Sequence, residues 1–290
     1  EIDSLRITWP SSKKVTDLKS IKVNQVIILK ESDAVAPVVR PRVNKLQKTF
    51  TKVEDFIDFT HTENDYIDFF QGQNIIPHKF SQIGPRMAKG DLNGDGQEDL
   101  LIGASSGQPT TAFVKEGSRF LLREIEGLTG DKSIQEADLQ IFDVDGDGDQ
   151  DVIAAAGGYM AEDEKQYRHV LYRNEKGNFV KEELPLPPFS ASVVRTFDFD
   201  KDGDLDVFIG CRVKKWNFPL SNNSYLLINN KGKFTLDEKF SFDLGMVTDA
   251  IWSDYDGDGW HDLIITREWN SVMILKNEKS NSLNPISDPA

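Results

Sequence analysis

The sequence predicts an all-β fold made of repeated four-stranded units, arranged as the blades of a β-propeller. An aspartate-rich nonapeptide, such as DVDGDGDQD at residues 143–151, occurs four times, and successive copies begin 52, 55 and 56 residues apart. Short apolar runs rich in Val and Ile lie on both sides of each copy, and more strand-like sequence follows around turns that contain Asn or Gly. Four-stranded units that repeat at about 40 to 60 residues are typical of propeller blades.

The chain before the repeats divides into two segments. Residues 1–31 are predicted to be strand-rich. Residues 32–48 contain Pro37 and Pro41 and are predicted to be a linker. Residues 49–290 then hold the repeats, which we predict to form a partial propeller.

Each nonapeptide is predicted to join two antiparallel strands, with its ninth residue, an aspartate, opening the second strand. An EF-hand loop begins in a similar way, but it needs a glutamate at position 12 and a helix on each side. Position 12 is instead Ile102, Ala154, Ile209 or Ile265. The EF-hand interpretation is therefore excluded in all four copies.

The second half of each unit is predicted to be a further hairpin. The runs FVKEGSRF from Phe113, LYRNEKGNF from Leu171 and LINNKGKF from Leu227 fit this pattern, whereas the fourth copy begins as ILKNEK at Ile274 and stops. We therefore expect the last blade to lack a fourth strand of its own. The segment TFTKVE from Thr49 resembles the other fourth strands and could supply it, as could sequence beyond residue 290.

The charge of the chain indicates metal binding. The net charge is −14, with 48 acidic and 34 basic residues, and 18 of the acidic residues lie in the four nonapeptides. Carboxylates this close repel one another unless a cation compensates them. Side-chain oxygens at positions 1, 3, 5 and 9, with the carbonyl of position 7, form an all-oxygen set that suits calcium better than magnesium or zinc. Nucleic acid is an unsuitable partner for such a chain.

We expect about four Ca²⁺ sites of unequal affinity. The first loop has only three carboxylates at the predicted ligand positions and is expected to bind most weakly, while the second and third have four and a further carboxylate at position 7. The fourth loop, with Trp260 at position 7, is expected to fall between. The candidate ligands are Asp91, Asn93, Asp95, Gln97 and Asp99; Asp143, Asp145, Asp147, Asp149 and Asp151; Asp198, Asp200, Asp202, Asp204 and Asp206; and Asp254, Asp256, Asp258, Trp260 and Asp262.

A ligand-binding face is expected at the other end of the blades. If the aspartate loops join strands one and two, the loops between strands two and three must emerge at the opposite end. Those loops carry aromatic and basic side chains, which are frequent anchors of interfaces. The alternative is that Trp216 and Phe218 pack against the neighbouring blade. The candidates for this face are Tyr159, Arg168, Lys215, Trp216 and Trp269.

Three other residues carry weaker signals. Cys211 is the only cysteine, so no internal disulfide is possible, and it is expected to be a small buried side chain. His261 at position 8 of the fourth loop is expected to be solvated. His169 beside Arg168 is the one histidine that we single out as a candidate acid or base.

These motifs resemble a known family. The D-x-[DN]-x-D-G-x-x-D loops and N-x-x-G-x-F turns are similar to the FG-GAP/VCBS repeats of integrin α-subunit propellers and of many secreted bacterial proteins. Residues 1–31, with their W-P-S turn, N-Q pair and final strand, resemble the end of an ASPIC/UnbV domain. The segment HTENDYIDFFQGQNIIPHKFSQIGP from His61 resembles the lead-in to the second propeller half of the cartilage acidic protein-like group. The resemblance implies a fragment of a longer protein.

Two classes of function follow from this resemblance. The first is a non-catalytic extracellular module, secreted or on a cell surface, that binds a protein or a glycan. The second is a carbohydrate-active enzyme, because similar propellers occur among polysaccharide lyases, which need a base and often a cation beside an acidic sugar. We favour the binding module, because each loop is expected to fill the coordination sphere of its metal with its own ligands and to leave no open position. No run of 18 apolar residues predicts a membrane span.

Overall fold

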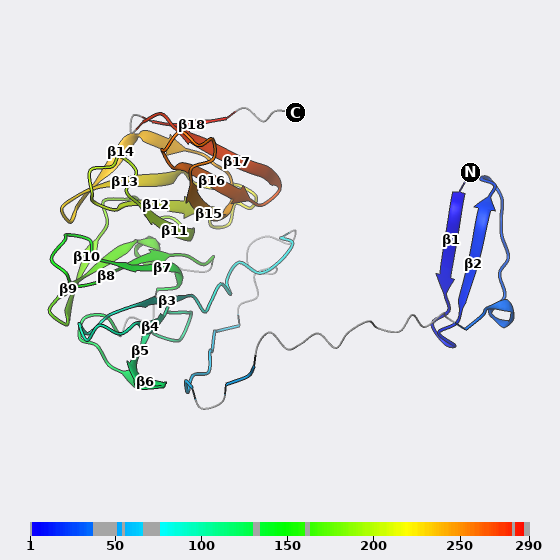
Figure 1. The fold of residues 1–290 in the computed structure, drawn as a ribbon, viewed down its shortest axis with the longest axis horizontal. Helices are drawn as coiled ribbons and strands as arrows, with labels where there is room; N and C mark the ends of the chain where they lie inside the picture. The colour runs from blue at the N-terminus through cyan, green and yellow to red at the C-terminus, as the bar shows by residue number, and fades with distance from the viewer. Residues whose placement is uncertain are drawn as a thin grey trace. The chain divides into compact units, whose positions relative to one another are not determined.

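The computed structural model describes residues 2–36, 51–53, 56–65, 76–129, 134–159, 163–279 and 282–286. The chain divides into two compact units, Glu1–Val53 and Glu54–Ala290. The described elements are almost entirely β-strands, as predicted (Figure 1). Within the described residues, no helix has the length and apolar character needed to cross a bilayer.

The N-terminal unit is built on one hairpin. Strand β1 (Ile2–Thr8) pairs antiparallel with β2 (Val15–Ile21). The short 3₁₀ helix η1 (Glu31–Asp33) follows, and Val35 then forms an isolated bridge with Val15, so the contacts of this unit continue past residue 31. The final strand implied by the ASPIC/UnbV resemblance does not form, since residues 22–30 contain no strand and Val26 and Ile28 are 93% and 84% exposed.

The second unit contains four antiparallel sheets of four strands each, connected in chain order. Their alternation of loop and strand follows the sequence repeat. The first sheet comprises β3 (Met87–Gly90), β4 (Asp99–Ile102), β5 (Thr111–Glu116) and β6 (Arg119–Arg123); the second β7 (Glu136–Phe142), β8 (Asp151–Ala156), β9 (Val170–Glu175) and β10 (Asn178–Glu183); the third β11 (Ala191–Phe197), β12 (Asp206–Cys211), β13 (Ser224–Asn230) and β14 (Lys233–Phe242); the fourth β15 (Val247–Ser253), β16 (Asp262–Arg267), β17 (Asn270–Asn277) and β18 (Leu283–Pro285). A 3₁₀ turn, η2 (Glu164–Tyr167), lies between β8 and β9.

The sheets pack face to face through their first strands. Strand β7 contacts β3 and β11, and β11 contacts β15. In Figure 1 these first strands lie on the inner side of the array, and β6, β10, β14 and β18 lie on the outer rim. Comparable packing between β3 and β15 is not found among the described residues.

The core fills the spaces between successive sheets. Fully buried side chains such as Val152, Ile209 and Leu263 come from the second strands, which are the most apolar of each sheet. The sheets approach so closely that a Cβ on Gly210 would lie 2.8 Å from side-chain carbons of Val193 and Val247. Because valine is stiff about χ1, a larger residue at position 210 would force the third and fourth sheets apart.

The expectation that the last blade lacks its own fourth strand was wrong. Strand β18, at Leu283–Pro285, pairs antiparallel with β17 through Leu283 and Asn277. Leu283 is buried and belongs to the core between the third and fourth sheets, which explains why so short a segment can act as a strand. Thr49, where the proposed substitute strand begins, lies outside the described residues, and residues 51–53 are not in a strand.

Candidate functional site

The four aspartate-rich loops share one hydrogen-bonded frame. We number them in chain order as the first loop (residues 91–99), second loop (143–151), third loop (198–206) and fourth loop (254–262). The carboxylate at position 9 is buried in all four and opens the second strand, as predicted. In the third loop, Asp206 Oδ2 accepts from Phe199 N at 2.8 Å and Oδ1 accepts from Asn229 N at 2.9 Å.

The same pair of hydrogen bonds recurs in the other loops. One oxygen of the position 9 aspartate accepts from the backbone N–H at position 2, and the other accepts from the third strand of the sheet. These contacts involve Asp99 with Leu92 and Lys115, Asp151 with Val144 and Asn174, and Asp262 with Tyr255 and Asn277. The aspartate at position 9 therefore links each loop to its own sheet through hydrogen bonds that do not involve a metal.

Backbone N–H groups also direct the other carboxylates. The aspartate at position 1 accepts from the amide at position 6, for example Gly148 N to Asp143 Oδ2 at 3.0 Å. The glycines at positions 4 and 6 have positive φ, and in the second loop Gly146 and Gly148 have φ of 78° and 96°. This left-handed backbone costs other residues roughly 1–2 kcal/mol, so glycine is favoured there.

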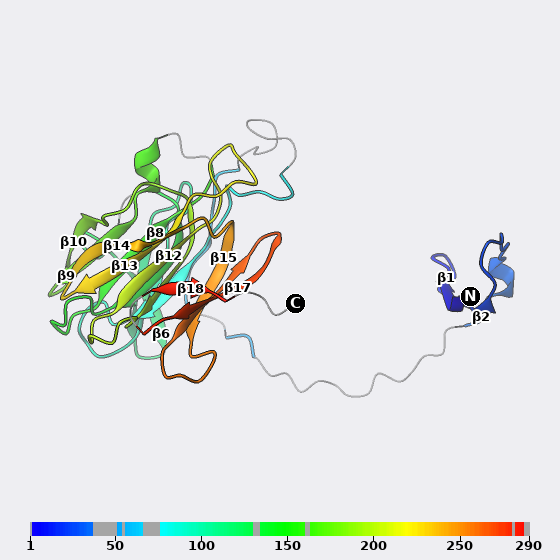
Figure 2. The same cartoon turned by 90° about the horizontal axis from the view of Figure 1, so that it is seen from above.

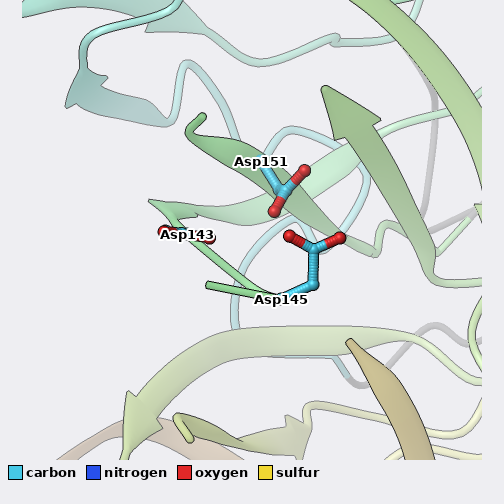
Figure 3. Close-up of side chains that lie close together, drawn as sticks. All are labelled: Asp143, Asp145 and Asp151. Atoms are coloured by element: carbon cyan, nitrogen blue, oxygen red, sulfur yellow. The ribbon is translucent and has the colours of Figure 1, made fainter. Parts of the chain in front are cut away.

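Three of the loops gather carboxylates into compact groups. In each, one carboxylate oxygen from each of positions 1, 3 and 9 lies within 4.8 Å of the other two: Asp143, Asp145 and Asp151; Asp198, Asp200 and Asp206; and Asp254, Asp256 and Asp262. Figure 3 shows the carboxylates of Asp145 and Asp151 facing each other. Since Ca²⁺–oxygen distances are about 2.3–2.6 Å, oxygens around one ion lie at most about 5 Å apart, so this spacing fits a calcium ion.

The pKa values reflect the crowding of these acids. Burial raises the pKa of Asp206 to about 7, with nearby Asp200 and Asp202 adding to the effect. Burial likewise raises the pKa of Asp151 to about 6. Burial and the neighbouring Asp202 also raise the pKa of Asp200. A bound cation would favour the ionised form of each of these groups.

The third loop carries a carboxylate oxygen that the others do not. Lys201 occupies position 4 with a φ of 62°, where the other three loops have glycine. In those loops the glycine N–H donates to Oδ1 of position 1, as Gly257 N does to Asp254 Oδ1 at 2.8 Å. In the third loop, Asp198 Oδ1 is buried and has no hydrogen-bond partner among the described residues. An unsatisfied buried anion of this kind is costly unless a ligand completes it.

A second difference is the counter-charge that the third strand of the sheet provides. In the second sheet Arg173 donates to Asp145 Oδ2 at 2.7 Å. In the fourth sheet Lys276 pairs with Asp256 and lies 3.3 Å from Asp258 Oδ2. The equivalent residue, just before the one that donates to position 9, is Val114 in the first sheet and Ile228 in the third. The third strand thus gives a basic side chain to two loops, the second and the fourth, and none to the first and the third.

The remaining predicted ligands are not members of these compact groups. At position 5, Asp95, Asp147, Asp202 and Asp258 accept from the amide at position 7. At position 7, Asp149 and Asp204 accept from Lys176 N and Lys231 N in the following hairpin turns. In the first loop, Asp91 and Asp99 keep the common frame, but position 3 is Asn93, so no group of three acidic side chains forms there.

The opposite end of the sheets carries the other predicted residues. Figure 2 shows η2 and the loop after β12 at one end and the loop between β15 and β16 at the other. Tyr159 is fully buried, and its ring centroid lies 5.3 Å from that of Trp216. It is therefore unavailable as a surface contact. Trp269 is 66% exposed and stands on Phe218 with ring centroids 4.9 Å apart.

The basic candidates at this end remain partly accessible. Arg168 is exposed and forms an ion pair with Glu183. Lys215 is half-buried and lies 5.8 Å from the ring centroid of Trp216, which is itself half-buried. The alternative prediction, that aromatic residues here pack onto the neighbouring blade, describes Phe218, which is buried in an apolar cluster with Met246.

Two histidine expectations need correction. His169 is buried, its Nδ1 accepts from Ala156 N at 3.1 Å, and burial lowers its pKa to about 3. It is therefore a neutral structural residue and not an accessible acid or base. His261 is half-buried against Phe197, with ring centroids 4.3 Å apart, instead of solvated. Cys211 is buried, as expected.

Sequence reasoning missed the basic partners of the loops. Arg173 and Lys276 stand directly before the asparagine of the YRNEKG and LKNEKS runs, while Ile228 precedes the asparagine of LINNKG. The difference between a basic and an apolar residue at this position is visible when the repeats are aligned. The relation of this residue to position 3 of the loop became clear only from the pairing of the third strand with the second.

Comparison with known proteins supports part of the family resemblance. A family model described as an FG-GAP-like repeat matches residues 91–154 and 143–209, which include the first three loops. No curated protein matches the chain. The ASPIC/UnbV resemblance of residues 1–31 stays a prediction.

Two solved structures illustrate the similarities at the level of structure. One is described as the basis of specific recognition of non-reducing terminal N-acetylglucosamine by a lectin of Agrocybe aegerita; it is 13% identical, covers 71% of this chain and 80% of its own, and has a TM-score of 0.23. The other is BBS1N in complex with ARL6DN, with 9% identity, coverage of 73% and 84%, and a TM-score of 0.27. At these scores neither similarity supports a conclusion about this protein. What the comparisons establish is that the chain contains FG-GAP-like repeats.

Proposed function

We propose that this protein is a calcium-stabilised extracellular module, without catalytic activity, that binds a protein or glycan. In this proposal the four sheets are blades of a β-propeller of the ASPIC/UnbV type, and the aspartate loops hold Ca²⁺ at one end of the blades. The other end carries the ligand. Calcium would supply charge neutralisation and cross-link the loop residues.

The observation that carries the proposal is the third loop. Its three gathered carboxylates include Asp198 Oδ1, which is buried without a partner among the described residues, and no basic side chain of its sheet neutralises them. An all-oxygen donor set of this charge matches calcium. Asp198, Asp200 and Asp206 would bind the ion directly, with Asp202 and the carbonyl of Asp204 as further donors. The second and fourth loops would use the corresponding residues.

The proposed location follows from calcium affinity. Extracellular calcium modules typically have a Kd of about 10⁻⁴–10⁻³ M, a concentration range that cytosolic calcium does not reach. A chain whose loops need calcium to neutralise four or five acids each would therefore be incompletely stabilised in the cytosol. This reasoning supports export.

The first test is calcium-linked stability. We expect a higher melting temperature in millimolar calcium than in EDTA, because calcium bound only to the folded state stabilises it by RT ln(1 + [L]/Kd) per site. At 100-fold excess over Kd, one site contributes roughly 2.7 kcal/mol. Equal magnesium serves as the control. An unchanged melting temperature would refute the calcium part of the proposal.

A second test addresses the enzymatic alternative. The protein, with calcium bound, is incubated with uronate-containing polysaccharides while the absorbance of unsaturated products is followed. We expect no turnover, since His169, the histidine singled out from the sequence, is buried with a low pKa. Sustained product formation would replace the binding module by a lyase-like enzyme.

A further inference from the structure

A cleft of about 240 Å³ lies at the end of the sheets opposite to the aspartate loops. Gly158 follows β8, Arg212 follows β12, and Ser190 precedes β11, so all three stand at strand ends remote from the loops. The segment that leads into the first sheet completes the wall through Phe80 and Arg86. All of these residues belong to the second unit.

The lining of this cleft is basic, although the chain has a net charge of −14. Four of its residues carry a basic or titratable nitrogen, and no acidic residue lines it among the described part of the chain. The four are His78, Lys79, Arg86 and Arg212. A concave site with one sign of charge and low-dielectric walls concentrates ligands of the opposite sign.

Arg212 is held in place with one donor unused. Its Nη2 pairs with Glu268, and its guanidinium lies 5.3 Å from the ring centroid of Phe80. Its Nη1 is buried and has no hydrogen-bond partner within the described residues. Since a buried charged donor without a partner is costly, this N–H is set up to meet an anion.

Arg86 has no ion-pair partner among the described residues, and it is exposed. By contrast, Lys79 pairs with Asp65, and His78 Nδ1 lies 3.8 Å from Glu268 Oε1. The groups left to address an anion are therefore the guanidinium of Arg86 and Nη1 of Arg212, since Glu268 already engages Nη2 of Arg212.

Aromatic rings continue from the cleft to the surface. Phe80 packs against Phe218 at 5.5 Å, and Phe218 packs against Trp269 at 4.9 Å. Trp269 directly follows Glu268, the partner of Arg212, and is 66% exposed with a φ of 62°. A non-glycine residue with positive φ costs roughly 1–2 kcal/mol, so an exposed tryptophan kept in that conformation is a candidate contact residue.

We propose that this cleft binds the anionic substituent of an acidic sugar, with Arg86 and Nη1 of Arg212 holding the anion and Trp269 stacking on an adjoining ring. Arginine donors suit carboxylate and sulfate groups, and the cleft is slightly smaller than the roughly 300 Å³ at which ligand pockets begin, which suits one sugar residue. A larger cavity of about 650 Å³ at the first sheet is lined by Asp58 and Glu124, so it is less suited to an anion. The inference deepens the proposed binding function and rests on it.

The test is calorimetric titration of the full chain in millimolar calcium with tetragalacturonate, a chondroitin sulfate tetrasaccharide and fully methyl-esterified tetragalacturonate. We expect at least one of the two anionic sugars to bind, and the esterified sugar, which has no carboxylate, to bind at least tenfold more weakly. Arg86→Gln and Trp269→Ala should each weaken binding roughly tenfold. Arg119→Gln, which removes an exposed arginine from the outer strand β6, should leave binding unchanged.

The outcomes separate this inference from the proposed function. If calcium raises the melting temperature but neither anionic sugar binds, the inference fails and the calcium-stabilised module stands. If binding occurs and Arg86→Gln leaves it unchanged in a variant with the wild-type melting temperature, the cleft is not the site. A tetra-aspartate peptide that binds as tightly as the sugars, and loses binding in Arg86→Gln, would overturn the sugar assignment. No calcium effect on melting would instead refute the proposed function.

Discussion

The third and fourth loops carry four carboxylates at the same positions, yet their surroundings differ. In the fourth loop Lys276 pairs with Asp256 and approaches Asp258, and both oxygens of Asp254 accept backbone N–H groups. In the third loop the corresponding side chain is Ile228, and Asp198 Oδ1 is buried with no partner in the described part of the chain. The carboxylates of the fourth loop thus have a counter-charge from their own sheet, whereas those of the third loop have no ion-pair partner among the described residues and are available to a cation.

This comparison separates two roles within one motif. Position 9 and its two backbone hydrogen bonds are common to both loops and belong to the fold. The counter-charge at positions 3 and 5 depends on the third strand, which provides Lys276 in the fourth sheet and Ile228 in the third. Motif counting alone would distinguish the third and fourth loops by position 7, whereas the structure adds a second difference, the counter-charge from the third strand.

The largest expected effect tests the shared frame. Asp206→Ala should lower the free energy of unfolding by roughly 2–6 kcal/mol even in EDTA, because it leaves the N–H groups of Phe199 and Asn229 buried without acceptors. Asp202→Ala, in the exposed part of the same loop, should have little effect in EDTA and act only when calcium is present. Urea unfolding with and without calcium measures both.

Asp206→Asn provides the matched control. Its amide keeps one acceptor and should recover part of the loss. If Asp206→Ala and Asp202→Ala lost equal stability in EDTA, position 9 would have no role beyond metal binding, and the division of the motif into two roles would be wrong.

An exchange of the counter-charge should sharpen the comparison. Lys276→Met should strengthen calcium binding at the fourth loop severalfold, because the ammonium group no longer competes for Asp256 and Asp258. Ile228→Lys should weaken the third site, because it introduces a cation at the equivalent position. In calcium calorimetry, Lys276→Met should therefore have one fewer weakly binding site than the wild type, and Ile228→Lys one fewer tightly binding site.

The control for this exchange is Lys239→Met, which removes an exposed lysine from β14. Unchanged calcium isotherms for both Lys276→Met and Ile228→Lys, in variants that fold normally, would contradict an influence of the third strand on affinity.

The smallest expected effect concerns the first loop. It has no basic partner, since the third strand offers Val114, but it has Asn93 at position 3 and should bind calcium most weakly. Asn93→Asp should strengthen this site modestly. Asp95→Ala should remove a weak binding step and Asp147→Ala a tighter one. If Asp95→Ala instead removed the tightest step, carboxylate count would not set the order of affinities.

The sequence by itself determined the repeated architecture and the chemistry of its loops. Each of the four nonapeptides ends in an aspartate that is followed by an apolar run, and this pattern predicted where β4, β8, β12 and β16 begin. The prediction was possible because strand patterns and loop spacing are local properties of the sequence. The all-oxygen donor types likewise follow from residue identity alone.

Only the tertiary structure decided which of those residues act together and which are inaccessible. Pairing between strands places Lys276 beside the fourth loop and Ile228 at the equivalent position of the third sheet. Packing between sheets buries Tyr159 and His169, while Trp269 stays exposed. The short strand β18 was missed because its pairing depends on burial of Leu283 against other sheets and not on its own sequence. Burial and counter-charge are long-range properties, since they depend on residues brought together from separate repeats, and a local pattern does not contain them.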